Sequence, residues 1–292
     1  MDSDLQKIES IKISRFRRVL NRLLQKLNIS VMKYGTYHLL IENSKNFRRL
    51  QQMNTSEISL NLFDFLVKNC GNSKSQLFQD LIVTYIIDNY LTEIEHGAPR
   101  IFIEFGACDG LKFSNTFLLE KNGWQGILAE PARKWHKELI ANRKCTISFN
   151  AVSNVTGKKV PFIETIEGEF SSLVSNSESD IFSNYRKDNI SSTYLVDTIS
   201  LNDLIEENGI SGVLTYLSID TEGGERNILE TFDLNKYRPA IISVEHNFSG
   251  EERLLDDFLL NFGYVRVLSS LSRFENWYCH NTRIAIPADG KF

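Results

Sequence analysis

The sequence predicts an α/β fold in which helices cover both faces of one open, mainly parallel β-sheet. From Arg100 onward, short runs of β-branched and aromatic residues alternate with segments of helical periodicity. The chain has 292 residues, 42% hydrophobic and 24% charged, so one large core can form without a disulfide or metal. We expect a Rossmann-like, doubly wound domain at 71–292, preceded by a helical extension at 1–70.

The first expected element is a basic amphipathic helix at 8–27. Its apolar residues recur at helical spacing with six Lys or Arg residues among them, and no acid occurs from 10 to 27. The basic face either stays in solvent while the helix packs on the domain, or it docks on an anionic membrane surface or a partner protein. A polar loop at 42–57 then leads to helices at 58–69 and 76–90.

The remaining elements belong to the sheet and its covering helices. Helices are expected at 131–142 and 251–262, where Pro131 suits a first helical turn. After them, 264–268 and 283–286 are expected to form a closing antiparallel hairpin. The polar stretch 164–192 fits no strand, and we interpret it as an insertion over the active-site edge of the sheet. The five expected central strands are 101–105, 126–130, 146–149, 213–219 and 240–245.

Charge and composition exclude several classes of protein. The net charge of −4 argues against nucleic acid as a partner. No run of 18 apolar residues exists, and the acidic N-terminus is not followed by an apolar signal region. The four cysteines form no C-x-x-C pair, which favours reduced thiols. We therefore expect a cytoplasmic protein, with peripheral contact to the inner face of a membrane if the 8–27 helix docks there.

A ligand-binding loop, Glu104-Phe-Gly-Ala-Cys-Asp-Gly110, follows the first strand directly. Ligands of open α/β sheets bind at this edge, and Gly106 and Ala107 let the backbone approach them closely. Cys108 and Leu111 occupy the second and third glycine positions of the dinucleotide fingerprint, which disfavours NAD and FAD. Glu104 and Asp109 instead suit a ligand that carries an ammonium and a sulfonium.

The second strand ends in Glu130, 24 residues after Gly106. An acid at this place can accept hydrogen bonds from both hydroxyls of a ribose. Ala151 and Val152, which we expect to end the third strand, would offer a backbone amide and an apolar surface to an adenine. The cofactor predicted from these residues is S-adenosylmethionine.

Several further motifs occur in a fixed order along residues 75–286. They are Ser75-Gln-Leu-Phe-Gln-Asp80, Phe102–Gly110, Ser114-Asn-Thr116, Leu119-Glu-Lys121, Gly123–Pro131, Ala151-Val-Ser153, Leu217–Gly223 with Glu225, and Val244-Glu-His-Asn247. This chain of motifs resembles the FkbM family of S-adenosylmethionine-dependent methyltransferases. The closing hairpin is also typical of methyltransferases rather than nicotinamide-binding folds. The sequence departs from the family pattern at Ser218, where many relatives carry Lys.

The resemblance implies methyl transfer to a hydroxyl of a small-molecule or glycan acceptor, with a saccharide as the leading class. Asp220 and Glu222 follow the fourth strand, and His246 follows the fifth, so all three are expected to face the reacting methyl group. We predict His246 as the general base. Four further residues are assigned to the acceptor or to a gate: Gln76, Asp80, Asn115 and Glu245.

A divalent cation is a further hypothesis. Asp220, Glu222, Glu245 and Asn247 converge at the ends of the fourth and fifth strands, and oxygen ligands of this kind suit magnesium, calcium or manganese. Alternatively, Arg226 or Arg238 compensates the acids, or one carboxyl stays protonated and acts as the base.

Two other functions stay open from the sequence. One is an N-methyltransferase that acts on an amino sugar or a small amine. The other is a non-catalytic module that keeps the cofactor fold for regulation, against which the acid set at Glu104, Asp109 and Glu130 counts.

Overall fold

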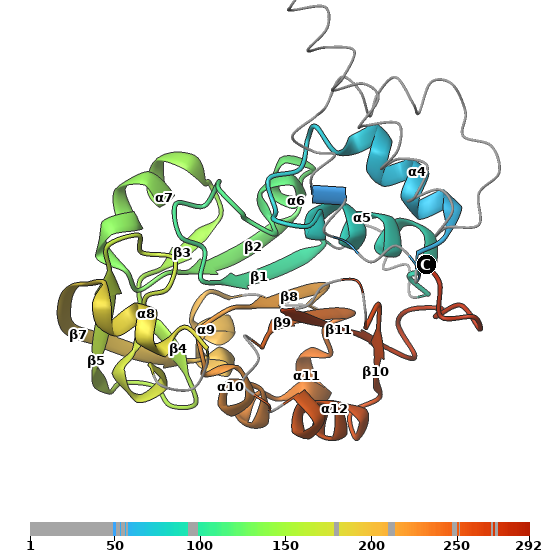
Figure 1. Ribbon diagram of the computed structural model, residues 1–292. Coiled ribbons are helices and arrows are strands. Elements are labelled where there is room, and N and C mark those ends of the chain that lie inside the picture. Colours follow the sequence, from blue (N-terminus) through green and yellow to red (C-terminus); the bar gives the residue numbers. More distant parts are fainter. Residues whose placement is uncertain are drawn as a thin grey trace, which may run out of the picture.

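The computed structural model confirms the doubly wound sheet (Figure 1). It describes residues 49–50, 53, 56, 58–92, 99–177, 181–209, 214–246, 250, 252–269, 271 and 274–292. Seven strands pair in the order β10-β11-β9-β8-β1-β2-β3, and every neighbouring pair is parallel except β10–β11 and β11–β9, which are antiparallel. Their bounds are β1 Ile101–Phe105, β2 Gln125–Ala129, β3 Thr146–Ser148, β8 Tyr216–Ile219, β9 Ile241–Glu245, β10 Tyr264–Val267 and β11 Glu275–His280.

Helices cover both faces of this sheet (Figure 1). Along β1, Phe102 packs with one helical layer, whereas Ile101 and Ile103 pack with the other, because successive strand residues point to opposite faces. The first layer contains α4 Leu60–Asn69, α5 Gln79–Tyr90 and α6 Phe117–Lys121. The second contains α9 Leu201–Glu207, α10 Glu225–Thr231, α11 Leu234–Tyr237 and α12 Glu252–Leu260.

A second sheet, in the order β4-β7-β5-β6, corrects two predictions. Ala151 and Val152 do not end the third strand but open β4, which pairs with β7. The stretch 164–192, predicted to fit no strand, contributes residues to β5, β6 and β7. β7 leaves one face exposed, so it lacks the continuous apolar run by which the central strands were recognised. The elements are β4 Ala151–Ser153, β5 Lys159–Thr165, β6 Ser172–Leu173, β7 Ile190–Ser200 and α8 Ser183–Asp188, with single-turn helices η2 Arg133–Trp135 and η3 Val174–Asn176 and the short helix α7 His136–Asn142.

The closing hairpin exists, but its second strand was misplaced. β10 pairs with β11 at 275–280, not with 283–286, and Ile284 forms a single bridge to Leu91. β11 is buried along its whole length although it contains Glu275, Asn276 and His280, so it lacks the apolar run that marks a buried strand.

The N-terminal predictions are only partly open to inspection. The 8–27 helix and Asn247 lie outside the described residues. The boundary between 70 and 71 stays a prediction; α4, on its N-terminal side, shares the core cluster of α5 and the sheet. Among the helices that the structure describes, none is long and apolar enough to cross a membrane.

Candidate active site

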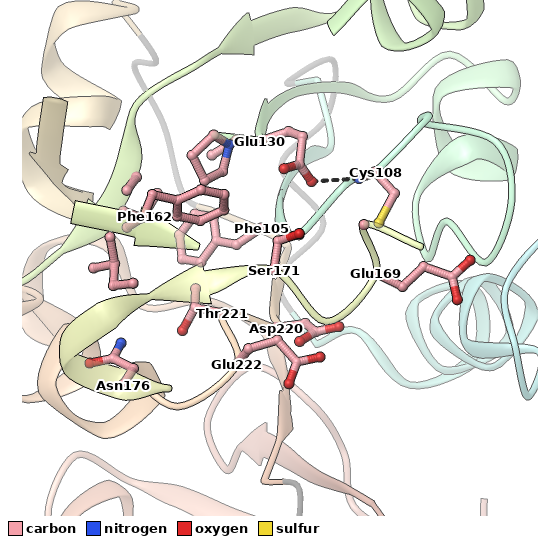
Figure 2. A pocket seen from close by; sticks show the side chains of 17 residues that line it. Phe105, Cys108, Glu130, Phe162, Glu169, Ser171, Asn176, Asp220, Thr221 and Glu222 are labelled. Carbon is pink, nitrogen blue, oxygen red and sulfur yellow. Dashed lines mark hydrogen bonds between the residues drawn. The ribbon is translucent and has the colours of Figure 1, made fainter. Parts of the chain in front are cut away.

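Two adjoining pockets lie at the carboxyl ends of β1, β2 and β8, where open α/β sheets bind their ligands. The first pocket (Figure 2) measures about 570 Å³ and the second about 1170 Å³, including in each case space that is open to solvent. The first also contains Glu130, Ala151 and Val152, whereas the second reaches Glu245. Six residues line both pockets and so mark their junction: Phe105, Gly106, Cys108, Glu169, Asp220 and Glu222.

Gly106 allows the ends of β1 and β8 to lie close together at this junction. Its φ of 69° lies in the left-handed region, and its N–H donates to the Ala129 carbonyl at 3.1 Å. A Cβ at this position would overlap the backbone oxygen of Asp220. Only glycine therefore lets the end of β1 approach the end of β8 this closely.

We expect Gly106→Ala to destabilise the fold by about 1–3 kcal/mol from the left-handed backbone alone. The overlap with Asp220 adds to this loss, because the neighbouring atom is backbone and cannot rotate away. Gly157→Ala is the matched control, since Gly157 has a φ of 79° but nothing within 4 Å of its added Cβ. Urea unfolding of both variants separates the two effects. Equal losses would show that the approach to Asp220 carries no constraint.

Glu130 bridges two loops at the first pocket. Its carboxylate accepts hydrogen bonds from the Cys108 N–H at 2.8 Å and the Ala132 N–H at 2.7 Å (Figure 2). Burial raises the pKa of this carboxyl to about 7, and the charge of Asp220 adds to the shift. Glu130 thus lies in the first pocket at the end of β2, where the sequence predicted a ribose ligand.

The two acids of the segment 104–110, Glu104 and Asp109, make structural contacts. Glu104 accepts hydrogen bonds from Ser114 Oγ at 3.0 Å and the Asn115 N–H at 2.6 Å, and lies 3.6 Å from Arg143. The Asp109 carboxylate bonds the N–H groups of residues 111 and 112. Neither Glu104 nor Asp109 is among the described residues that line the first pocket. Glu104 lines the second pocket instead, together with Ala107 of the same segment.

Asp220 and Glu245 form a buried carboxyl pair at the ends of β8 and β9. Their side chains hydrogen-bond to each other, which requires one of them to carry a proton. Burial raises the pKa of both groups, and that of Glu245 rises further because Asp220 and Glu222 add negative charge beside it. Because the pKa of Glu245 is raised further, we assign the shared proton to Glu245 and the ionised form to Asp220.

The third acid of this cluster, Glu222, is compensated by a residue that sequence reasoning missed. Arg186 on α8 donates to Glu222 Oε2 at 2.6 Å, and its side chain is fully buried. Arg226, which the sequence offered for this role, pairs with Glu230 on α10, and Arg238 precedes β9, at the end of that strand opposite Glu245. No local signal marks Arg186, because its partner lies 36 residues away in the chain.

These contacts account for the charges that suggested a metal. Among the residues that the structure describes, no group of three His, Cys, Asp or Glu side chains is arranged to hold an ion. Asp220, Glu222 and Glu245 converge as predicted, but an arginine and a shared proton compensate them.

Comparison with known families decides the kind of domain that carries this site. Residues 104–266, more than half of the chain, match the family model described as the methyltransferase FkbM domain. The chain belongs to the FkbM methyltransferase family. No curated protein matches it significantly.

Among solved structures, three similar chains are methyltransferase domains with low identity to this one. The human methyltransferase 10 domain containing protein is 14% identical, with 68% of this chain and 80% of that one covered and a TM-score of 0.35. The METTL16 methyltransferase domain in crystal form 2 is 14% identical, with 83% and 90% covered and a TM-score of 0.39. The N-terminal domain of human METTL16 in complex with SAH is 13% identical, with 83% and 92% covered and a TM-score of 0.35.

The FkbM motif Val244-Glu-His-Asn247 does not present the predicted base to the site. His246 lies outside both pocket linings as far as the structure describes them, and its Nδ1 is 3.3 Å from Glu252 on α12. Neighbouring residues of extended backbone point to opposite sides, so Glu245 faces the second pocket and His246 does not. His246 thus lies apart from the described linings of the two pockets, and its assignment as general base stays a prediction that this geometry does not favour.

Of the residues predicted to contact the acceptor or to form a gate, Gln76 and Asn115 line the second pocket and Asp80 does not. Asn115 donates to Ser218 Oγ at 3.0 Å. Asp80 is fully buried and accepts bonds from Ser73 Oγ at 2.6 Å and Ser75 Oγ at 2.9 Å, which shape the loop before α5.

Sequence reasoning missed two further residues of the second pocket, Gln79 on α5 and Glu275 on β11. They meet across 196 residues of chain, at 3.3 Å between Gln79 Nε2 and Glu275 Oε2. A separation of this length leaves no trace in local spacing.

Proposed function

We propose that the protein is an S-adenosylmethionine-dependent O-methyltransferase that acts on a hydroxyl of a saccharide or glycan precursor. The observation that carries this proposal is the Asp220–Glu245 carboxyl pair at the junction of the two pockets. Asp220 lines both pockets, so a proton acceptor lies where the first pocket meets the second.

The first pocket fits the cofactor that the family implies. Among its described lining are four carboxyl groups and no Lys or Arg, which suits a cationic ligand and disfavours a pyrophosphate. Glu130 would hold the ribose hydroxyls, and Ala151 and Val152 would contact the adenine. When bound, S-adenosylmethionine supplies an electrophilic methyl group.

The chain's own residues prepare the acceptor. Asp220 Oδ1 is buried and has no hydrogen-bond partner among the described residues, so it can take the proton of an acceptor hydroxyl. Glu245 keeps its proton and donates a hydrogen bond to Asp220, which orients the Asp220 carboxylate. From the insertion, Phe170 and Phe182 line the second pocket and limit access of water.

The same pair favours a hydroxyl over the alternatives. A hydroxyl is a weak nucleophile until its proton leaves, whereas a neutral amine attacks without a base. A module that only binds the cofactor needs no proton acceptor at the junction.

Labelled S-adenosylmethionine and a saccharide extract test this function directly. We expect mass spectrometry to find the methyl group on an oxygen, in the wild type and in the exposed control Glu207→Gln. Transfer to nitrogen would support the amine alternative. Cofactor binding without transfer to any acceptor would support the non-catalytic module.

We expect Glu130→Ala to weaken S-adenosylhomocysteine binding roughly tenfold to a hundredfold. The loss of a charge-assisted pair of hydrogen bonds costs on the order of 1.5–3 kcal/mol. Titration calorimetry measures the affinity, and circular dichroism checks that the fold survives. An unchanged affinity would refute the ribose assignment.

A further inference from the structure

The second pocket presents many hydrogen-bond acceptors and few donors. Lys112 is the one basic side chain among its described lining residues, and its Nζ lies 2.5 Å from Glu169 Oε1. Two buried acceptor atoms, Asp220 Oδ1 and Asn115 Oδ1, have no partner in the part of the chain that the structure describes. Six carboxyl groups line the pocket: Glu104, Glu169, Asp220, Glu222, Glu245 and Glu275.

Three of these carboxyl groups lie along one edge of the sheet. Asp220 follows β8, Glu245 ends β9, and Glu275 opens β11, which is the order of neighbouring strands. Glu245 and Glu275 are direct cross-strand partners, an arrangement that destabilises a sheet when both are charged. Burial raises the pKa of Glu275 to about 7, and Asp220 contributes to the shift. Because Glu245 keeps its proton, Glu275 is the member of this cross-strand pair that can ionise, and a bound cation would stabilise its charged form.

Aromatic rings face the same space. Phe170 and Phe182 of the insertion line the second pocket, with their ring centroids 4.9 Å apart, and Phe274 and Phe113 line it elsewhere. Aromatic faces attract ammonium groups and pack against the apolar faces of sugar rings.

From these features we propose that the acceptor carries a positively charged amino group, and that Glu275 and Gln79 form its recognition site. This rests on the proposed function, because an amino sugar then binds with its amino group at Glu275 and its reacting hydroxyl at Asp220. An acceptor that bears a phosphate meets repulsion from the acidic edge and is excluded. Both recognition residues lie outside the segment 104–266 that matches the family model.

Binding of matched sugars tests the charge preference without turnover. The probes are glucosamine, galactosamine, their N-acetyl forms and their parent sugars, and glucose and galactose 6-phosphates. Affinities are measured by ligand-observed NMR with and without S-adenosylhomocysteine. We expect at least one amino sugar to bind tenfold or more tightly than its N-acetyl and parent forms, and the phosphates to bind more weakly than the parent sugars.

Glu275→Gln keeps the shape of the side chain and removes its charge. We expect it to abolish the preference for the amino sugar and to leave the affinity for the parent sugar within about twofold, whereas Glu207→Gln, at the exposed end of α9, leaves both unchanged. Equal affinities for amino and parent sugars, tighter binding of a phosphate, or no binding of any amino sugar would overturn the proposal. Failure of S-adenosylhomocysteine to bind would count against the proposed function alone, because the preference is also measured in its absence.

Discussion

Replacing Asp220 with Asn is expected to lower kcat by roughly 10²- to 10⁴-fold, the usual contribution of a general base. The amide introduced by Asp220→Asn is nearly the same size as the carboxyl group but cannot accept the hydroxyl proton. Because Asp220 also lines the first pocket, calorimetry with S-adenosylhomocysteine must accompany the kinetics. A loss in kcat that is much larger than the loss in affinity identifies a group that acts in the reaction.

Glu245→Gln provides the matched comparison. Glu245 keeps its proton beside Asp220, and the amide that replaces its carboxyl group can donate the same hydrogen bond. We therefore expect Glu245→Gln to lose far less activity than Asp220→Asn. The reverse order would make Glu245 the base and Asp220 its partner.

The same assignment sets the pH dependence. Burial raises the pKa of Asp220 to about 6, so its base form is present above that pH and is lost as the pH falls through it. We expect kcat/KM for the acceptor to fall by about tenfold for each pH unit below 6, and this slope to disappear in Asp220→Asn. A wild-type profile that is flat between pH 5 and 7 would exclude a carboxyl base with this pKa.

Arg186→Met is expected to have the largest effect on stability, a loss of about 3–5 kcal/mol, because it leaves a buried carboxylate without its cation. Arg186 donates to Glu222 at 2.6 Å, to the Phe170 carbonyl at 3.0 Å and to the Ser177 carbonyl at 3.0 Å. Arg186 therefore connects the insertion at 164–192 to Glu222, which follows β8. We expect cofactor affinity to fall together with stability, since the insertion lines both pockets.

Urea unfolding of two further variants separates charge from packing. In Arg186→Met with Glu222→Gln, the uncompensated charge is gone, so part of the lost stability should return. Lys236→Met removes an exposed ion pair with Glu206 and should change the midpoint little. If the double variant is no more stable than Arg186→Met, the ion pair is not what holds the insertion.

Local patterns in the sequence are sufficient to predict the parallel strands and the sheet edge at which ligands bind. β1 coincides with the apolar run at 101–105. Glu130, 24 residues after Gly106, lies with it in the first pocket. Such features depend on local periodicity and on the rule that parallel strands bring their carboxyl ends to one edge. For the same reason Asp220, Glu222 and Glu245 converge where the spacing placed them.

Which of these groups faces the pockets depends on contacts between distant parts of the chain. His246 and Glu245 are adjacent in sequence, and the pairing of β9 with β11 turns Glu245 into the site and His246 toward α12. Arg186 reaches Glu222 across 36 residues of chain, and Gln79 and Glu275 meet in the second pocket across 196. β11 is buried without an apolar pattern. Local spacing carries no information about such partners, because a compensating charge or proton depends on which distant side chain the folded chain brings within hydrogen-bonding distance.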